Sequence, residues 1–292
     1  MTVHADASYG GPGTPRRRAR LGRVVRRART KLGAAALTAM VALTLTPVIV
    51  NVAQATTATY AVGIYSSLEP SGEAPPITSS LPGYNLSYIN DFIGTSLPAG
   101  WNTFTGIPGG DPGGQFASSH VTVSGGLLRL NTWKDRQYRG HWVTGGLCQC
   151  GLARTYGAYF VRSRVTGAGP NEVELLWPVT NLWPPEIDFS ETGGSLSFTT
   201  ATVHFGSANV MDHSTLNVDM TQWHTFGVLW TPNAVTYLVD GRVWGVIAQS
   251  SHIPRVPMTL DMEQRTRCTV GRQCPVSPVT MQVDWVAEYV PS

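Results

Sequence analysis

Three carboxylates lie within the six-residue segment 186–191, whose sequence is EIDFSE. On an extended strand successive side chains point to opposite faces, so Glu186 and Asp188 share one face while Ile187 and Phe189 share the other. Glu191 lies five residues after Glu186, an odd spacing that would place it on the apolar face. A β-bulge near Phe189 adds one residue and returns Glu191 to the acidic face. The segment therefore predicts a bulged strand with three acids on one patch of sheet.

Acids held this close together repel one another, which raises the pKa of at least one of them. Glycoside hydrolysis needs such a set, because one carboxylate must be ionised and another protonated at the same pH. In retaining enzymes the two carboxyl groups are about 5–5.5 Å apart. The alternative is a solvated acidic strand face, and the six residues alone do not decide between the two.

Charge is unevenly distributed along the 292 residues, although the formal net charge is +3. Positions 1–55 hold nine of the 21 basic residues and one of the 18 acidic residues. The remainder carries 12 basic and 17 acidic residues, a net charge of −5. Phosphate binding needs a clustered positive surface, so we expect no nucleic-acid partner for this part of the chain.

Residues 1–55 have the pattern of an export signal. A basic region spans Arg16 to Lys31, an apolar region spans Leu32 to Val50, and Ala53-Gln54-Ala55 fits a small-residue cleavage site. An uncleaved membrane anchor is the main alternative. We expect cleavage, a secreted protein and no membrane contact afterwards. The arginine pairs suggest a twin-arginine signal, but the export route stays open.

Four cysteines are present, and an even number in an exported chain favours disulfides over free thiols. Cys268 and Cys274 would close a short loop. A bond between Cys148 and Cys150 would close a small, strained ring, so cross-pairing between the two segments competes with it. The spacings do not resemble those of zinc ligands.

The rest of the chain predicts an all-β domain. Residues 56–83 are rich in Thr, Ser and Pro, which is typical of a flexible linker. From residue 84 to 292 short β-branched and aromatic runs alternate with Gly, Pro, Asn and Asp, and Asp240-Gly241 is a strong hairpin signal. We expect one domain, a two-sheet antiparallel sandwich or jelly roll. The expected strands are 121–123, 127–133, 156–165, 172–177, 186–190, 195–205, 223–230, 235–239, 242–247, 258–262 and 279–289.

The pattern E-x-D-x-x-E after Trp-Pro resembles the catalytic signature of glycoside hydrolase family 16 in its bulged, laminarinase-like form. Further segments resemble the family in the same order, over roughly residues 84–292. They are Arg154–Arg162 (RTYGAYFVR), Leu175–Pro178 (LLWP), Thr202–Gly206 (TVHFG), Trp223–Pro232 (WHTFGVLWTP), Tyr237–Gly241 (YLVDG) and Val283–Val286 (VDWV). The chain departs from the usual family pattern at Ser190, Pro185, Phe160 and the short loop between Trp177 and Trp183. The length of this loop affects whether the family's usual preference for laminarin applies.

The resemblance implies a concanavalin-like jelly roll with a cleft across its concave sheet. It makes Glu186 the nucleophile, Glu191 the acid/base and Asp188 the residue that orients and tunes the nucleophile. Asp284 resembles an acid that helps to hold a structural calcium ion away from the active site in many members. Catalysis itself would need no cofactor.

Several other side chains are candidates for substrate contact. Trp177 and Trp183 flank the acidic strand and could stack on sugar faces, although core packing is the ordinary role of strand tryptophans. Trp142 lies near a loop that could border the cleft. The polar candidates are His204, Arg154 and Gln264.

We therefore expect a monomeric, retaining, endo-acting glycoside hydrolase that cuts internal β-linkages of a polysaccharide. β-1,3-glucan is the leading substrate and galactans are the alternative. A non-catalytic glycan-binding module and a transglycosylase on the same fold remain as rivals. A polysaccharide lyase would need a basic or tyrosine proton acceptor, and this motif is acidic.

Overall fold

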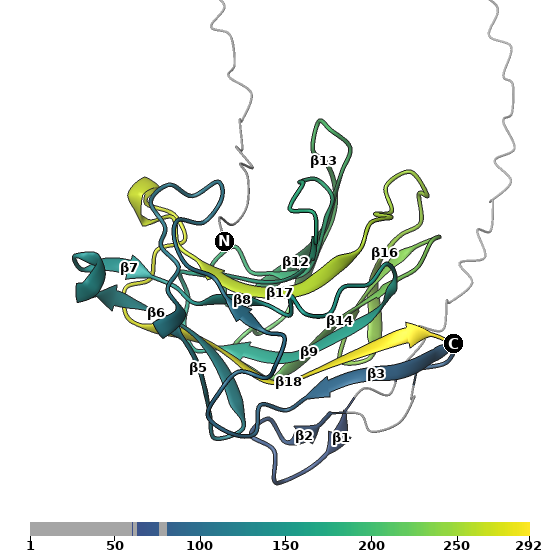
Figure 1. Cartoon of the computed structure of the whole chain (residues 1–292), viewed down its shortest axis with the longest axis horizontal. Coiled ribbons are helices and arrows are strands. Elements are labelled where there is room, and N and C mark those ends of the chain that lie inside the picture. The colour runs from purple at the N-terminus through teal and green to yellow at the C-terminus, as the bar shows by residue number, and fades with distance from the viewer. Residues whose placement is uncertain (1–59, 61–62, 76–80) are drawn as a thin grey trace, which may run out of the picture. The chain divides into compact units, whose positions relative to one another are not determined.

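The computed structural model describes Tyr60, residues 63–75 and residues 81–292. These residues form two large antiparallel sheets packed face to face, as Figure 1 shows, together with a small separate hairpin. This confirms the all-β sandwich. The described residues contain no α-helix, only three short 3-10 turns: Ser118–His120, Arg136–Tyr138 and Cys268–Val270. No helix in this part of the chain has the length and apolar character needed to span a bilayer.

The first sheet has seven strands and carries the acidic segment. Its order is β13-β12-β11-β10-β17-β8-β4. The bounds are β13 Val210–Asn217, β12 Phe198–Phe205, β11 Glu186–Glu191, β10 Asn171–Pro178, β17 Met258–Arg265, β8 Gly146–Cys148 and β4 Asn102–Thr103.

The second sheet has nine strands. Seven of them follow the order β16-β15-β14-β9-β18-β6-β5, while β3 pairs with β18 and β7 pairs with β6. The bounds are β16 Arg242–Ile247, β15 Val235–Val239, β14 His224–Trp230, β9 Gly157–Val165, β18 Val279–Pro291, β6 Leu127–Asp135, β5 Val121–Ser124, β3 Tyr84–Asn90 and β7 His141–Val143.

The main apolar core fills the space between the sheets. The seven-stranded sheet contributes Ile187 and Phe189 of β11, and the facing sheet contributes residues such as Val161 and Phe226; all four are fully buried. Strand alternation then directs the intervening side chains of the seven-stranded sheet to its other, concave face. The core thus fixes which side chains reach the concave face.

A second apolar cluster covers the outer face of the nine-stranded sheet. It contains Phe160, Trp285 and Tyr289, with Tyr60 and Tyr84 packed against it. Because β9 is buried on both faces, its first half, residues 157–161, is a continuous apolar run in the sequence.

Part of the segment expected to be a linker differs from that expectation. Residues 63–75 contain the small hairpin of β1 (Ile64–Tyr65) and β2 (Glu73–Ala74). The Ser71 amide donates to Asp284 Oδ2 at 3.0 Å, and the Trp285 indole donates to the Glu73 carbonyl at 2.8 Å. Arg162 also bonds to Ser71. These bonds tie the hairpin to the sandwich, since they satisfy polar groups that the sheet buries. The expected export signal, residues 1–55, lies outside the described residues.

Each expected strand is present, with ends shifted by a few residues, but five strands of the two sheets were not expected: β3, β4, β7, β8 and β13. The cysteines form two local disulfides, Cys148–Cys150 and Cys268–Cys274, with Cα atoms 5.0 and 4.7 Å apart. Both separations are ordinary for a disulfide. Cross-pairing between the two segments is therefore wrong.

Candidate active site

The acidic strand contains the predicted bulge. Asp188 pairs with Thr202 of β12, and Glu191 pairs with Thr200. Three residues of β11 thus span the same distance as two residues of β12, so β11 holds one extra residue between Asp188 and Glu191. The register with β10 skips Phe189 in the same place. The bulge keeps Phe189 in the core and brings all three acids to the concave face.

Glu186 and Asp188 lie in a compact cluster with His204 of β12. The Trp183 indole nitrogen donates to Glu186 Oε2 at 2.6 Å. His204 pairs with Glu186 across the strands, and its Nε2 lies 3.3 Å from Asp188 Oδ2. Its Nδ1 lies 2.8 Å from Asn209 Oδ1. Both ring nitrogens face oxygen acceptors, an arrangement that only the doubly protonated imidazolium satisfies fully.

Glu191 is held by a separate set of partners. Asn171, the first residue of β10, donates from Nδ2 to Glu191 Oε1 at 2.8 Å. The Glu191 amide donates to Thr199 Oγ1 at 2.9 Å. Sequence reasoning missed Asn171, because it lies 20 residues from Glu191 and only the strand pairing brings the two together.

Charge crowding and burial shift the pKa values in the predicted direction. Burial, and then the charge of Asp188, raise the pKa of Glu186 well above its ordinary value, while His204 and Trp183 oppose the shift. The same two causes raise the pKa of Glu191. Burial lowers the pKa of His204, but its hydrogen bond and charge interaction with Asp188 outweigh this and raise it to about 9. The cluster therefore places two mutually repelling acidic side chains beside a protonated histidine, with a third carboxyl group further along the strand.

The same three side chains could in principle hold a metal, because ligand atoms of Glu186, Asp188 and His204 lie within 4.8 Å of one another. A metal-binding histidine must be neutral, however. With a pKa of about 9, His204 is protonated at neutral pH and donates to Asp188 instead. The cluster fits an ion pair better than a metal centre.

The neighbouring strand β10 supplies an apolar floor. Val173, Leu175 and Trp177 form one buried cluster, and Trp183 packs against it. They share the concave face, because Leu176 between them points into the core. The structure thus brings both predicted tryptophans beside the acids. The Trp177 indole donates to Asn181 Oδ1 at 2.7 Å.

Strand β17 places two more acids on the concave face. Asp261 pairs with Leu175 and Glu263 with Val173, while Leu260 and Met262 are in the core. Burial raises the pKa of Asp261 well above its ordinary value and also raises that of Glu263, against the opposing charge of a neighbouring arginine. The strict alternation of residues 258–263, MTLDME, was the signal that could have found them.

Two predicted sugar contacts are wrong in position. Gln264 is fully buried and faces the space between the sheets. It accepts a hydrogen bond from Thr132 at 2.7 Å and donates to Glu172 at 3.2 Å. Arg154 forms an ion pair with the buried Glu288 of the opposite sheet at 3.6 Å. Strand alternation turns Gln264 away from the acids of β11. The buried carboxylate of Glu288 draws Arg154 away from them.

Trp142 is not placed beside the acids either. It lies on β7, which pairs with β6 of the nine-stranded sheet, and its ring is 5.5 Å from Lys134 Nζ.

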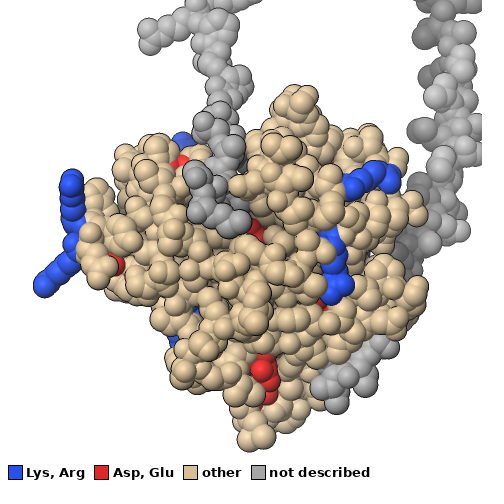
Figure 2. All heavy atoms as spheres, in the orientation of Figure 1, with Lys and Arg blue, Asp and Glu red and all other residues tan. Residues whose placement is uncertain are grey.

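Figure 2 shows a mostly uncharged face of the molecule, with its few acidic and basic side chains scattered rather than gathered.

Residues 116–286, more than half of the chain, match the sequence profile of the glycosyl hydrolases family 16. The chain belongs to glycosyl hydrolase family 16. A curated relative is the endo-1,3-1,4-β-glycanase ExsH of Rhizobium meliloti (strain 1021), which is 35% identical over 94 residues. That match covers 30% of this chain and only 20% of ExsH.

Solved structures of two laminarinases and of an endo-β-1,3-glucanase share the fold. The laminarinase of Rhodothermus marinus is 20% identical, with a TM-score of 0.64 over 73% of this chain and 99% of that one. The catalytic domain of an endo-1,3-β-glucanase (laminarinase) of Thermotoga petrophila RKU-1 is 18% identical, with a TM-score of 0.60 over 72% and 98%. The endo-β-1,3-glucanase of Pyrococcus furiosus is 18% identical, with a TM-score of 0.60 over 72% and 96%.

Family 16 enzymes act without a cofactor. The predicted calcium residue Asp284 is buried; its Oδ2 accepts from Ser71, and its Oδ1 has no hydrogen-bond partner among the described residues. Asp91 and Glu69 are near enough to interact with its charge. This set is suitable but incomplete for calcium, which takes six to eight oxygens. A structural calcium ion at Asp284 therefore remains a proposal.

Proposed function

We propose that this family 16 protein is a retaining, endo-acting glycoside hydrolase that cuts internal β-linkages of a polysaccharide. The observation that carries the proposal is the bulge in β11, which brings Glu186, Asp188 and Glu191 onto one face of the concave sheet. Five-residue spacing on a regular strand would have sent Glu191 into the core. An endo-acting enzyme binds its polymer along an extended surface, and the seven-stranded sheet that carries the acids can supply one.

The proposed reaction is a double displacement. Glu186 attacks the anomeric carbon, the glycosidic bond breaks, and Glu191 gives its proton to the departing oxygen. Glu191, now ionised, takes a proton from water, and the hydroxide oxygen displaces Glu186 from the same carbon. One water is consumed, and both carboxyl groups return to their starting state.

The surroundings of each glutamate support this division of roles. Glu186 accepts from the Trp183 indole and faces the imidazolium of His204, and both stabilise its ionised form. Burial and the charge of Asp188 raise the pKa of Glu191, which favours the protonated form that a general acid needs. The same two causes also raise the pKa of Glu186, where the charge of His204 and the hydrogen bond from Trp183 oppose the shift. Asp188 tunes Glu186 through His204, which it binds directly.

β-1,3-glucan is the leading substrate, with a galactan as the alternative. The names of the structural neighbours, laminarinase and endo-1,3-β-glucanase, support the first choice. At 17–21% identity these neighbours share the fold, and the short loop between Trp177 and Trp183 is the feature that bears on linkage preference.

The test is digestion of a panel of linear β-glucans and galactans, with proton NMR of the first product formed. We expect internal cleavage of one glucan and early appearance of the β anomer, because double displacement retains configuration. Early α anomer would reject the roles of Glu186 and Glu191. Binding without any cleavage would favour the glycan-binding module, and transfer to added oligosaccharide in place of water would favour the transglycosylase.

A further inference from the structure

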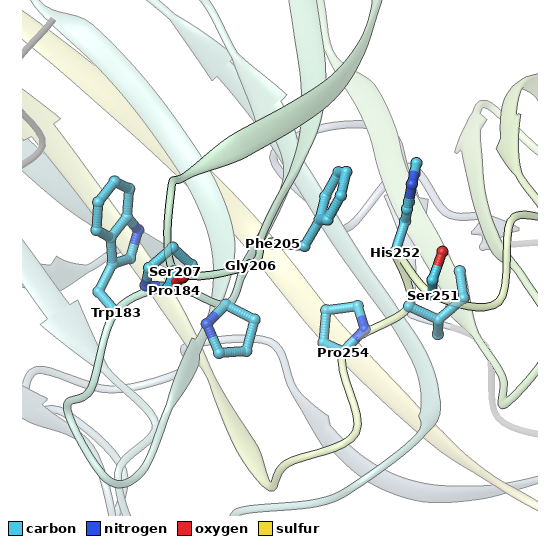
Figure 3. A pocket seen from close by; sticks show the side chains of 10 residues that line it. Trp183, Pro184, Phe205, Gly206, Ser207, Ser251, His252 and Pro254 are labelled. Atoms are coloured by element: carbon cyan, nitrogen blue, oxygen red, sulfur yellow. The ribbon is translucent and has the colours of Figure 1, made fainter.

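A pocket of about 480 Å³ opens beside Trp183, outside the row of acids on β11. Its wall comes from residues 183–185 before β11, residues 205–207 at the end of β12, and residues 251–254 before β17. Figure 3 shows Trp183 on one side and Phe205 with His252 on the other. The volume lies in the usual range of small-molecule sites, about 300–1,000 Å³. We call this the side pocket.

The walls of the side pocket are aromatic. The rings of Phe205 and His252 are stacked, with centroids 3.8 Å apart and planes at 19°. Phe205 and Trp183 are only partly buried, although both are large and apolar. Rigid aromatic faces of this kind bind apolar surface at low entropic cost, and the C–H faces of a pyranose ring are such a surface.

The side pocket also has polar groups suited to hydroxyls. Ser207 and Ser251 contribute to its rim. The Nδ1 atom of His252 lies in close contact with the Asp212 carboxylate. That contact occupies Nδ1, so Nε2 is the ring nitrogen left to hydrogen-bond with a hydroxyl group of a ligand.

The charges around the side pocket favour a neutral ligand. Of the ten residues that line it, all within the described part of the chain, His252 alone is ionisable, and it is paired with the carboxylate of Asp212. Glu186 and Asp188 lie on the adjoining strand. No lysine or arginine lines the pocket to pair with an anionic sugar, such as a uronate or a sulfated unit, and the nearby imidazolium of His204 is already paired with Asp188.

The position of the side pocket distinguishes a branch from a main-chain sugar. Seven strands spaced about 4.8 Å apart make the concave sheet roughly 29 Å wide across the strands. A polysaccharide that extends over several strands therefore has its longest contact in that direction. The side pocket instead lies beyond the ends of β11 and β12, to one side of this path.

We infer that the side pocket binds a single neutral sugar carried as a side branch on the main-chain sugar beside Glu186. The inference rests on the proposed hydrolase function and adds branched glycans to its substrates. Trp183 joins the two sites, because it lines the pocket and donates to Glu186.

Binding to the full chain carrying Glu191→Gln, which cannot complete the reaction, tests the side pocket by calorimetry. The probes are a linear β-1,3-gluco-hexaose and the same hexaose with one β-1,6-linked glucosyl branch on an internal sugar. We expect the branched probe to bind roughly tenfold more tightly, the gain expected from one well-packed aromatic contact. Phe205→Ala should reduce the affinity for the branched probe to that for the linear one.

Val210→Ala is the matched control, because Val210 pairs with Phe205 on β13 but is exposed and outside the pocket lining. It should leave the preference intact. Ser207→Trp is a second test at an exposed turn position, since its indole fills the pocket and should weaken only the branched probe.

Equal binding of the two probes, binding of neither, or an equal loss for both in Phe205→Ala would overturn the side pocket. Hydrolysis of the linear probe by the unmodified chain is measured in parallel. If the branched probe binds more tightly but no hydrolysis occurs, the branch-binding role of the side pocket stands and the hydrolase proposal is rejected. If hydrolysis occurs without that preference, the hydrolase proposal stands and the branch-binding role is rejected.

Discussion

The indole nitrogen of Trp183 donates a hydrogen bond to Oε2 of Glu186 at 2.6 Å. An indole N–H can only donate, so the bond stabilises the ionised carboxylate over the protonated acid. The residue that the sequence suggested as a sugar-stacking surface thus also favours the ionised form of the proposed nucleophile, against the burial and the Asp188 charge that raise its pKa.

Trp183→Phe removes this donor and keeps most of the ring. Without the bond the pKa of Glu186 rises further, so the acidic limb of the pH profile of kcat/KM should move to higher pH. Trp177→Phe is the matched control, because the Trp177 indole donates to Asn181 rather than to an acid, and it should leave that limb in place. Equal shifts in both variants would contradict the role of Trp183.

Glu186→Gln and Glu191→Gln should each lower kcat by several orders of magnitude, because the two act as a unit. Asp188→Asn should cost less, since Asp188 acts through its neighbours. Turnover on the preferred glucan measures the effect, and circular dichroism checks the fold. Near-normal turnover in a folded Glu186→Gln protein would refute the assignment.

His204→Asn removes the cation that faces Glu186 and Asp188. The two negative charges then repel without compensation, so the acidic limb of kcat/KM should again move to higher pH. His213→Asn, at an exposed position on the next strand, is the control and should have no effect. In the unmodified protein His204 also stabilises the fold fully below pH 6.5, and this contribution is lost as pH rises through about 9.

Buried glutamates should make the fold most stable in mild acid. Burial raises the pKa of Glu172 and Glu174 to about 8 and that of Glu288 to about 7. Between about 4.5, the unfolded value, and these values the folded state binds more protons, so the free energy of unfolding falls as pH rises. Each proton contributes about 1.4 kcal/mol per pH unit.

Urea titrations at pH 5, 6.5 and 8 measure that slope. Glu172→Gln should flatten it, because the amide keeps the size of the neutral acid and cannot ionise. A free energy of unfolding that is independent of pH across this range would show that these groups are not buried as protonated acids.

We propose that the protein is exported and oxidised. The secreted form should begin near Thr56, and peptide mapping without reductant should find Cys148 linked to Cys150 and Cys268 linked to Cys274. Four alkylatable thiols, or an intact Met1 on a membrane-bound product, would contradict this prediction.

The sequence predicted the elements that follow a local rule. Period-two alternation in β11 located the acids and the core side chains Ile187 and Phe189, and the odd spacing of Glu186 and Glu191 predicted the bulge. These predictions succeeded because strand geometry depends on residues that are near in sequence.

What the sequence could not predict depends on pairing between distant strands. Asn171 reaches Glu191 only because β10 lies beside β11, and Gln264 is buried because the register of β17 turns it inward. The short or polar strands β4, β8 and β13 have no strong pattern of their own. They form by pairing with neighbours in the seven-stranded sheet, where β13 and β4 are the edge strands and β8 lies between β17 and β4.

The hairpin of β1 and β2 has a practical consequence for anyone who produces this domain. A chain trimmed to begin at residue 84 would keep every acid of the cleft, yet Asp284, Arg162 and Trp285 would lose their partners in residues 71–73. The outer surface of the nine-stranded sheet would then expose aromatic side chains and a poorly compensated buried charge, which promotes aggregation. The yield of folded protein should therefore fall, while the activity of each folded molecule changes little. Expression is better started upstream of the hairpin.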